Sequence, residues 1–380
     1  MEAPCSLLRV ERIFTPEPSD ATDILMCGER IAWVGKRLDP PAGWPVELVE
    51  VPGALAVPGF IDGHVHVTGG GGEGGYATRC PEISVDEIVA AGVTTVVGCL
   101  GTDDVTRHPE ALLAKVRALE EQGVSAYMYV GSYAVPPVTL TGSVKRDLVL
   151  IDKVIGVGEI AISDHRSAQP QPAELRRLAA EARVGGMLAG KAGIVHVHVG
   201  SGRDGLKPLF DIVEQTELPI TQFVPTHVNR TRRLLDEAER FASLGGTVDV
   251  TAFDFPSADA VPAWQAIVQL AGRGVEWSRI TMSSDSNGSL PEFDESGRLV
   301  RMRVASIRSL LADWRSLVRQ ARVPLERALQ VVTSNVASVL KLQRKGRLLP
   351  GMDADIAVFD GDLNVLQVWC RGRRLHPPGA

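Results

Sequence analysis

The order of apolar segments constrains the fold of this chain more than any other feature of the sequence. Between residues 54 and 284, apolar runs of strand length alternate with amphipathic stretches of helical period. Strands that alternate with helices form parallel sheets, and eight such units close into a barrel of ~250 residues. We therefore predict an α/β fold, a (β/α)8 TIM barrel. Its predicted strands cover residues 54–61, 93–98, 125–130, 159–163, 194–199, 220–224, 247–251 and 280–284.

Local signals place several of the helices between and after these strands. Ser84 and Glu87 have the spacing of a capping box, which predicts that a helix begins there. A second helix is predicted over 109–122, because Gly123 follows its last amphipathic turn. Amphipathic patterns predict two further helices, over 231–243 and 323–340.

The sequence pattern at the two ends of the chain differs from the pattern in the middle. Short β-type runs separated by turn residues precede residue 54, and similar runs follow the turn Leu349-Pro350-Gly351. The simplest topology pairs both ends. We predict a small β-sandwich domain made of residues 1–53 and 344–380, beside a barrel domain made of residues 54–343.

Composition excludes several classes of protein. Hydrophobic residues make up 44% of the 380 residues, enough for a large core. The net charge of −6 argues against a nucleic-acid partner or an anionic membrane surface, and no segment approaches the ~20 apolar residues of a membrane span. The five cysteines show no CxxC spacing, so we expect neither a disulfide framework nor a thiolate zinc site, and we predict a cytoplasmic protein.

Histidine and aspartate side chains stand where four of the barrel strands end. Side chains alternate along a strand, so His64 and His66 project to the same side and can bind one metal ion. His198, His227 and Asp285 end three further strands. Reactive groups of such barrels lie at this edge. This set of imidazoles and a carboxylate predicts a metal centre, with Zn²⁺ expected and Mn²⁺, Co²⁺ or Fe²⁺ as alternatives.

Charged residues near these strand ends predict the class of substrate. Arg166 and Arg230 each follow a strand that carries a metal-site residue, and guanidinium groups bind carboxylates with two hydrogen bonds. Glu73 lies on a glycine-rich loop after His66, where it can pair with an ammonium group. A substrate with one amine and carboxylates at a fixed distance from a hydrolysable bond is dipeptide-like.

The motifs that carry these residues resemble those of the isoaspartyl (β-aspartyl) dipeptidases, in the amidohydrolase superfamily. The HxH motif is shared by the whole superfamily, whereas the glycine run with Glu73 and the two arginine motifs narrow the resemblance to the dipeptidases. It extends over nearly the whole chain. The matching segments are residues 58–66, 69–73, 101–103, 162–167, 225–230, 283–289 and 351–356.

The resemblance implies a binuclear metal centre that hydrolyses β-aspartyl dipeptides. It places His64 and His66 on one ion and His198 and His227 on the other. Asp285 would bind the first ion and face a hydroxide that bridges both. Two divalent cations lower the pKa of a shared water toward neutrality. Asp285 would then act as general base and acid, passing a proton to the leaving amine.

The resemblance also implies how a dipeptide is held. The implied roles are Glu73 for the α-amino group, Ser289 for the α-carboxylate of the isoaspartyl unit, Arg166 and Arg230 for the carboxylate of the second residue, Tyr133 for the developing oxyanion, and Gly71 and Thr102 for further backbone and hydroxyl contacts. A homo-oligomer, often an octamer, is implied as well.

The chain departs from the family at the group that bridges the two metals. Relatives use a lysine carboxylated by carbon dioxide at the end of the fourth strand, but Glu159 stands there, with one extra residue upstream. A glutamate is shorter, so the strand must come closer, and a bulge beside Gly158 would supply that shift. Our hypothesis is that Glu159 bridges the metals; the alternative is an ordinary buried ion-pair partner in a one-metal site. Lys153 and Lys191 are poorly placed to substitute.

Two other functions stay open at this stage. One is hydrolysis of cyclic amides or N-acyl amino acids on the same barrel. The other is a non-catalytic assembly protein, which the presence of all four histidines and Asp285 disfavours. His196 matches no family ligand, and we expect it to support the metal ligands or pack in the core.

Overall fold

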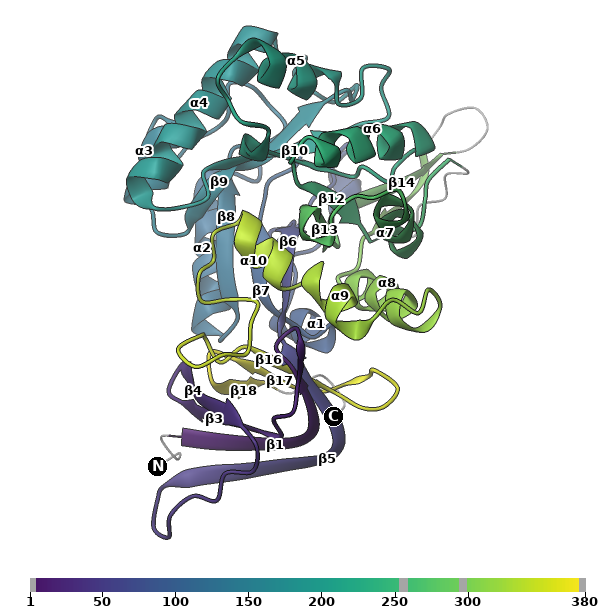
Figure 1. Ribbon diagram of the computed structural model, residues 1–380. Helices are drawn as coiled ribbons and strands as arrows, with labels where there is room; N and C mark the ends of the chain where they lie inside the picture. The colour runs from purple at the N-terminus through teal and green to yellow at the C-terminus, as the bar shows by residue number, and fades with distance from the viewer. Residues whose placement is uncertain (1–4, 253–258, 294–298, 376–380) are drawn as a thin grey trace.

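Parallel strands surrounded by helices form the main body of the protein. The computed structural model describes residues 5–252, 259–293 and 299–375 (Figure 1). Six strands form one sheet in the order β11-β10-β9-β8-β7-β6, and β12 pairs with β13. A parallel bridge between Val65 and Ser286 joins the first strand to the segment after the last. The strands are β6 (Phe60–Val65), β7 (Val93–Gly98), β8 (Ser125–Val130), β9 (Val154–Ile162), β10 (Ile194–Val199), β11 (Phe223–Thr226), β12 (Val248–Thr251) and β13 (Ile280–Ser283).

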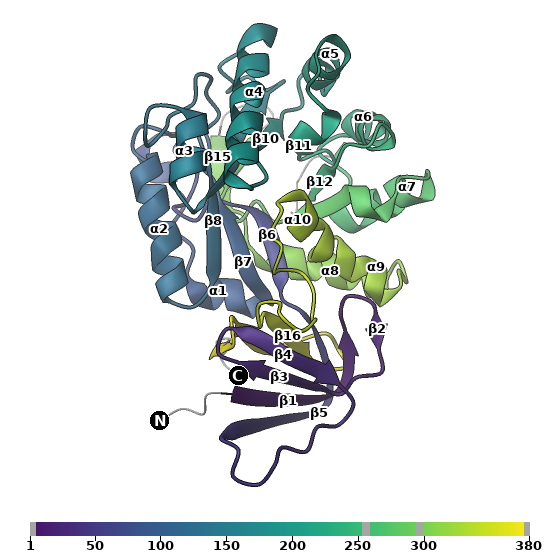
Figure 2. The same ribbon diagram turned by 60° about the vertical axis from the view of Figure 1, so that its left-hand side comes forward.

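Helices cover the outside of these strands, as both views show (Figures 1 and 2). This arrangement confirms the predicted α/β barrel fold. A hairpin of β14 (Ser289–Phe293) and β15 (Leu299–Val304) follows β13. The helices are α1 (Val85–Ala90), α2 (Pro109–Glu121), α3 (Val144–Leu150), α4 (Pro172–Ala189), α5 (Lys207–Gln215), α6 (Arg232–Ser243), α7 (Ala263–Gly272), α8 (Arg308–Arg319), α9 (Leu325–Gln330) and α10 (Ser334–Val339), with short 3-10 turns at Tyr76–Thr78, Ile220–Gln222 and Trp277–Arg279.

The predicted boundaries are confirmed where local chemistry sets them. The capping box is present, because the Ser84 hydroxyl accepts from the Glu87 amide and the Glu87 carboxylate accepts from the Ser84 amide. The single helix predicted over 323–340 is wrong. It divides into α9 and α10 at Thr333, whose hydroxyl donates to the carbonyl of Leu329, four residues back, at 2.6 Å.

The strand predicted over 159–163 is too short, because β9 begins already at Val154. Two further predicted strands have different limits. The run 54–61 is the end of β5 (Val46–Pro58) followed by the beginning of β6, because the chain leaves one sheet and enters the other at Pro58 and Gly59. The run 220–224 begins as a 3-10 turn, and β11 starts only at Phe223. Both errors come from reading a continuous apolar run as a single element.

A second sheet contains both ends of the chain, as predicted. The last strands join the first ones where β16 pairs antiparallel with β5, placing Ile356 opposite Pro58. This sheet lies below the barrel in Figure 2. It contains β1 (Cys5–Phe14), β2 (Pro18–Ser19), β3 (Asp23–Cys27), β4 (Arg30–Gly35), β5, β16 (Ile356–Phe359), β17 (Val365–Cys370) and β18 (Arg373–Leu375). We retain the division at residues 53 and 343 as a proposal.

An aromatic cluster joins the end sheet to the barrel. Phe60 at the start of β6 lies 5.0 Å from Trp314 of α8 and 5.8 Å from Phe359 of β16, between ring centroids. All three side chains are fully buried. Their packing fixes β6 at the end opposite to its histidines, so the strand that carries the predicted metal ligands is held from below.

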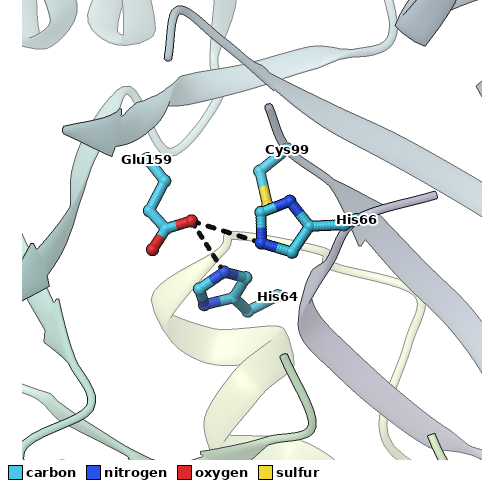
Figure 3. Close-up of side chains that lie close together, drawn as sticks. All are labelled: His64, His66, Cys99 and Glu159. Atoms are coloured by element: carbon cyan, nitrogen blue, oxygen red, sulfur yellow. Dashed lines mark hydrogen bonds and ion pairs between the residues drawn. The ribbon is translucent and has the colours of Figure 1, made fainter. Parts of the chain in front are cut away.

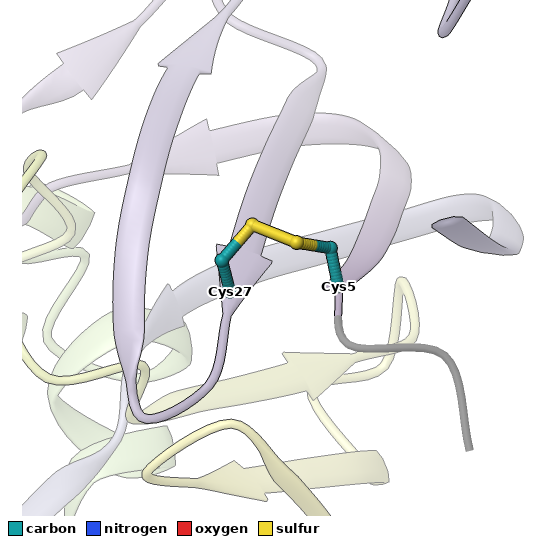
Figure 4. Close-up of a disulfide and its surroundings, with 2 residues drawn as sticks. All are labelled: Cys5 and Cys27. Atoms are coloured by element: carbon teal, nitrogen blue, oxygen red, sulfur yellow. A yellow bond between two sulfur atoms is a disulfide. The ribbon is translucent and has the colours of Figure 1, made fainter. Parts of the chain in front are cut away.

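The expectation about cysteines is wrong in one respect. Cys5 and Cys27 form a disulfide between β1 and β3 (Figure 4). The two residues are 22 positions apart in the sequence, but the antiparallel register places them opposite each other. Sequence spacing carries no signal for such a pair, because strand register alone brings the two residues together. Cys80, Cys99 and Cys370 are free and buried.

Within residues 5–252, 259–293 and 299–375, no helix combines the length and the apolarity needed to cross a bilayer.

Candidate metal centre and substrate cavity

Four histidines from three strands converge on the carboxylate of Glu159. One carboxylate oxygen, Oε2, lies 3.0 Å from Nε2 of His64 and 3.6 Å from Nε2 of His66 (Figure 3). The other oxygen, Oε1, lies 2.7 Å from Nδ1 of His198 and 3.2 Å from Nε2 of His227. All five side chains are buried. Each carboxylate oxygen therefore faces one of the two predicted histidine pairs.

The backbone beside Glu159 contains the predicted bulge. Between β9 and β10 the pairing advances by three residues on β9, from Val157 to Ile160, but by two on β10. The extra residue lies beside Gly158, where a Cβ atom would be 2.8 Å from the carbonyl oxygen of His196. Only glycine tolerates this close approach of β9 to β10. The bulge is thus confirmed as a local property of the strand that carries Glu159.

Asp285 lies on the side of the first histidine pair. Its Oδ1 is 3.1 Å from Nε2 of His66 and 3.4 Å from Nε2 of His64. This oxygen is buried and has no hydrogen-bond partner. Burial raises the pKa of Asp285, but attraction to the nearby imidazoles, that of His64 first, outweighs burial and lowers the pKa to about 2. The carboxylate is therefore ionised at neutral pH.

The pKa of Glu159 is also displaced. Burial acts to raise it, but the surrounding imidazoles, His64 first, outweigh burial and hold the pKa well below its usual range. Among the described residues, its ion-pair partners are these imidazoles, and the structure pairs no lysine or arginine with it. The groups that face this carboxylate are therefore ones that can bind a metal ion through nitrogen.

The donor atoms fit a pair of metal ions. Two overlapping groups have their ligand atoms within 4.8 Å of one another. Imidazole nitrogens and carboxylate oxygens suit divalent transition metals. The buried Oδ1 of Asp285 has no hydrogen-bond partner, so it is available as a further metal ligand. The groups are His64, His66, Cys99 and Glu159, and Glu159, His198 and His227, so they share the carboxylate.

The outer nitrogens of the first histidine pair face a histidine and a cysteine. His196 places Nε2 3.1 Å from Nδ1 of His64, and its ring stacks on Tyr129 at 4.8 Å between centroids. Cys99 places its sulfur 3.9 Å from Nδ1 of His66. His196 therefore contacts a predicted metal ligand and also packs in the core. Sequence reasoning missed Cys99, although its position directly after β7, at the same edge of the barrel, was an available signal.

The predicted recognition residues line a single cavity of about 700 Å³. The carboxylate of Glu73 lies 3.4 Å from Arg166 and accepts a hydrogen bond from Ser289 at 3.1 Å. The Tyr133 hydroxyl lies 2.8 Å from Nδ1 of His198, and Arg166 stacks over the Tyr133 ring. The residues shared with the prediction are Gly71, Glu73, Thr102, Tyr133, Arg166, Arg230 and Ser289, and His66, His198 and Asp285 line the same cavity.

Burial shapes the electrostatics of this cavity. It raises the pKa of Tyr133 well above the usual value, and the nearby Glu159 carboxylate adds to this shift, so the phenol stays protonated. Burial also lowers the pKa of the Arg230 guanidinium. A protonated phenol and two arginines make the cavity suited to anionic groups of a ligand.

Asp164 is a site residue to which the sequence assigned no role. It follows β9 and lies between Arg166 and His198, with its carboxylate 2.9 Å from each. It belongs to one of the matched segments, so its place beside Arg166 was visible, but nothing in the sequence indicated its contact with His198.

Comparisons with known proteins agree with this site. The amidohydrolase family model matches residues 55–375. A solved β-aspartyl dipeptidase from Fervidobacterium islandicum AW-1, in complex with the β-Asp-Leu dipeptide, is 43% identical, with a TM-score of 0.94 and coverage of 100% of this chain and 98% of that chain. A deacetylase from Brucella anthropi is 25% identical over 91% of this chain and 81% of its own length. The dihydropyrimidinase of Brevibacillus agri NCHU1002, 16% identical with a TM-score of 0.66 over 98% of this chain and 95% of that one, shares the fold.

Proposed function

The chain belongs to the amidohydrolase family, and we propose that it hydrolyses β-aspartyl (isoaspartyl) dipeptides. One observation carries the proposal. A single cavity joins the histidine and carboxylate cluster to Glu73 and to two arginines, so groups suited to an ammonium and to carboxylates surround the reacting centre. The full-length similarity to a β-aspartyl dipeptidase supports the same substrate class.

We assign the metal ligands from the arrangement around Glu159. His64 and His66 would hold one ion together with Asp285, and His198 and His227 would hold the other, with one Glu159 oxygen toward each. Zn²⁺ is our proposed metal, because imidazole and carboxylate donors suit it. When bound, two such ions lower the pKa of a shared water and supply a nucleophile at neutral pH.

The cavity residues would orient the dipeptide. Glu73 would pair with the α-amino group, displacing the Arg166 guanidinium that lies 3.4 Å away in the free protein. Arg166 and Arg230 would then bind the carboxylate of the second residue. Ser289 would donate to the α-carboxylate of the isoaspartyl unit, and Gly71 and Thr102 line the same wall.

Two side chains would act on the reacting atoms. Asp285, ionised and facing the cavity, would take the proton of the attacking water and deliver it to the nitrogen of the breaking amide bond. Tyr133 keeps its proton, so its hydroxyl can donate to the carbonyl oxygen as negative charge develops there. The products are the isoaspartyl unit as aspartate and the free second amino acid.

A cyclic-amide or N-acyl amino acid hydrolase is the second candidate. The deacetylase similarity, at 25% identity, is the observation in its favour. A cyclic amide or an N-acyl amino acid carries no ammonium group, so that activity would leave Glu73 without a counterpart, yet Glu73 lines the cavity beside the histidine cluster. A non-catalytic assembly role is less well supported still, because the donor set is complete.

We also propose that the protein forms a homo-oligomer, up to an octamer, in the cytoplasm. Its proposed partners are small substrates, and neither nucleic acid nor membranes. Exposed apolar side chains gather at the ends of α3 and α4, where Leu150, Met187 and Leu188 are each more than 60% exposed, and a subunit contact would cover them. The Cys5–Cys27 disulfide is the observation against a reducing compartment. Light scattering tests the assembly, and thiol labelling of protein taken from cells tests the redox state.

The test of the proposed function uses two isomeric substrates. Metal-loaded protein is incubated with β-Asp-Leu and with α-Asp-Leu, and release of free leucine is followed. We expect hydrolysis of the β-linked dipeptide and little of the α-linked one. Equal rates, or activity on N-acetyl-leucine alone, would overturn the assignment.

A further inference from the structure

One buried carboxylate, that of Asp164, contacts both a proposed metal ligand and a proposed substrate-binding residue. Its Oδ1 accepts from the amide of Arg166 at 2.8 Å and from Nε at 3.0 Å. Its Oδ2 accepts from the terminal nitrogen NH2 of Arg166 at 2.9 Å and lies 2.9 Å from Nε2 of His198. Both oxygens are therefore fully used within the protein.

The backbone holds this carboxylate in place. Ser163, just before Asp164, has φ of +53° and turns the chain sharply at the end of β9, while its hydroxyl donates to the carbonyl of Gly205 at 2.8 Å. Gly200 packs so closely that a Cβ there would lie 2.6 Å from Cβ of Asp164. The loops after β9 and β10 thus enclose Asp164 without space for another side chain.

The contact with His198 decides which ring nitrogen carries the proton. Nδ1 of His198 lies on the side of Glu159, at 2.7 Å, where a bound metal ion would take its lone pair. The ring proton would then be on Nε2, and the Asp164 carboxylate, 2.9 Å away, would accept it. His227 has a different support, since its outer nitrogen lies 2.9 Å from the hydroxyl of Thr251. Among the described side-chain contacts, the one between Thr251 and His227 does not extend to Arg166, whereas Asp164 links His198 directly to Arg166.

The contact with Arg166 decides which part of the guanidinium meets the cavity. Asp164 occupies Nε and NH2, and the remaining nitrogen, NH1, faces Glu73. Arg230 approaches the same carboxylate, with 3.8 Å between NH1 and Oδ2. One negative charge therefore lies between two guanidinium groups that would otherwise repel each other.

We propose that Asp164 is a positioning residue that couples recognition of the substrate carboxylate to the orientation of a metal ligand. The inference rests on the proposed dipeptidase function and adds a residue to it. Asp164 contacts Nε2 of His198 and binds Nε and NH2 of Arg166, so the proposed metal ligand and the proposed carboxylate-binding residue keep a fixed separation. Losing the carboxylate should disturb metal retention and carboxylate selectivity together.

Asp164→Asn is the direct test, because it keeps the shape but replaces one oxygen with an amide group. If that group faces His198, it forces the proton onto Nδ1; if it faces Arg166, two donors oppose each other. We expect zinc affinity to fall by roughly 10- to 100-fold, the range typical when a group supporting a metal ligand is removed, and zinc loss to a chelator to accelerate with it. We also expect the preference for β-Asp-Leu over its C-terminal amide to disappear.

Two matched variants separate the two effects. Arg166→Met should lose the preference for the free carboxylate and keep its metals. Thr251→Val should release metal faster and keep the preference. The double variant of Asp164→Asn with Arg166→Met should show no preference beyond that of Arg166→Met alone, because the two residues act as a unit.

The proposal is overturned if Asp164→Asn retains zinc like the unaltered protein or keeps its preference for the free carboxylate. Should Asp164→Asn not fold, Asp164→Ser is measured by the same criteria. If the unaltered protein hydrolyses no β-aspartyl dipeptide, the proposed function fails separately, and zinc release, which needs no substrate, still decides whether Asp164 holds His198.

Discussion

Replacing Glu159 with glutamine removes one negative charge from the centre of the four histidines while keeping the side chain's shape. Each oxygen of the native carboxylate faces two imidazoles at 2.7 to 3.6 Å. Glutamine offers one neutral oxygen and one NH2 group, and the NH2 group cannot bind a cation. One of the two proposed metal positions therefore loses its shared ligand, whichever way the amide turns.

The size of the effect follows from burial. Glu159 is fully buried, and removing one partner of a buried charged pair costs about 3–5 kcal/mol. Applied to metal binding, this corresponds to a loss of roughly 100- to 4,000-fold in affinity. We therefore expect Glu159→Gln to retain at most one zinc ion per subunit after dialysis against a weak chelator, while the unaltered protein retains two.

The measurement is metal content by mass spectrometry, normalised to protein concentration. Glu73→Gln is the matched control, because it makes the same chemical change in a carboxylate that lines the cavity and contacts Arg166 and Ser289, and it should retain both ions. Two tightly held zinc ions in Glu159→Gln would refute the assignment of Glu159 as the shared ligand.

Three further predictions concern recognition and stability. Arg230→Met should lower kcat/KM for β-Asp-Leu by roughly 30- to 1,000-fold, because about 2–4 kcal/mol of charge-assisted hydrogen bonding is lost. Metal content should not change, and normal kinetics would make Arg230 a structural residue. Gly158→Ala should lower the free energy of unfolding by about 1–3 kcal/mol, because the new Cβ would lie 2.8 Å from the carbonyl oxygen of His196. Chemical denaturation measures this change, and an unchanged midpoint would contradict the close approach of β9 and β10. The Cys5–Cys27 disulfide joins residues 22 positions apart, so reducing it should lower the free energy of unfolding by about 3 kcal/mol. Reductant should therefore lower Tm in the unaltered protein and not in Cys27→Ser, and equal responses would argue against the disulfide.

The sequence predicted those parts of the site that depend on local rules. Alternation along β6 placed His64 and His66 on one side, and parallel strands brought their ends to a common edge. The resemblance aligned Glu159 with the lysine of the family and left one extra residue beside Gly158, where the structure has the corresponding bulge. The structure brings these side chains together, because their placement depends on strand ends and on a few adjacent residues.

What the sequence missed depends on contacts between distant segments. Asp164 could be taken for the neighbour of Arg166, but its contact with His198 exists only once β9 and β10 pair. Cys99 contacts His66 across two strands, and Cys5 meets Cys27 through an antiparallel register. In each case, tertiary pairing decides the partner, and the residue itself carries no distinguishing pattern.

We propose that a glutamate supplies the shared carboxylate at the position where the resemblance implies a carboxylated lysine. The most direct measurement strips the metal with a chelator and restores Zn²⁺ in degassed, bicarbonate-free buffer, with β-Asp-Leu hydrolysis as the readout. A glutamate ionises near pH 4 as a free group, and its pKa here is lower still, so its charge needs no carbon dioxide. We predict full recovery of activity without bicarbonate and no change when bicarbonate is added. Recovery that requires bicarbonate would mean that a lysine enters the site, and it would contradict the assignment of Glu159.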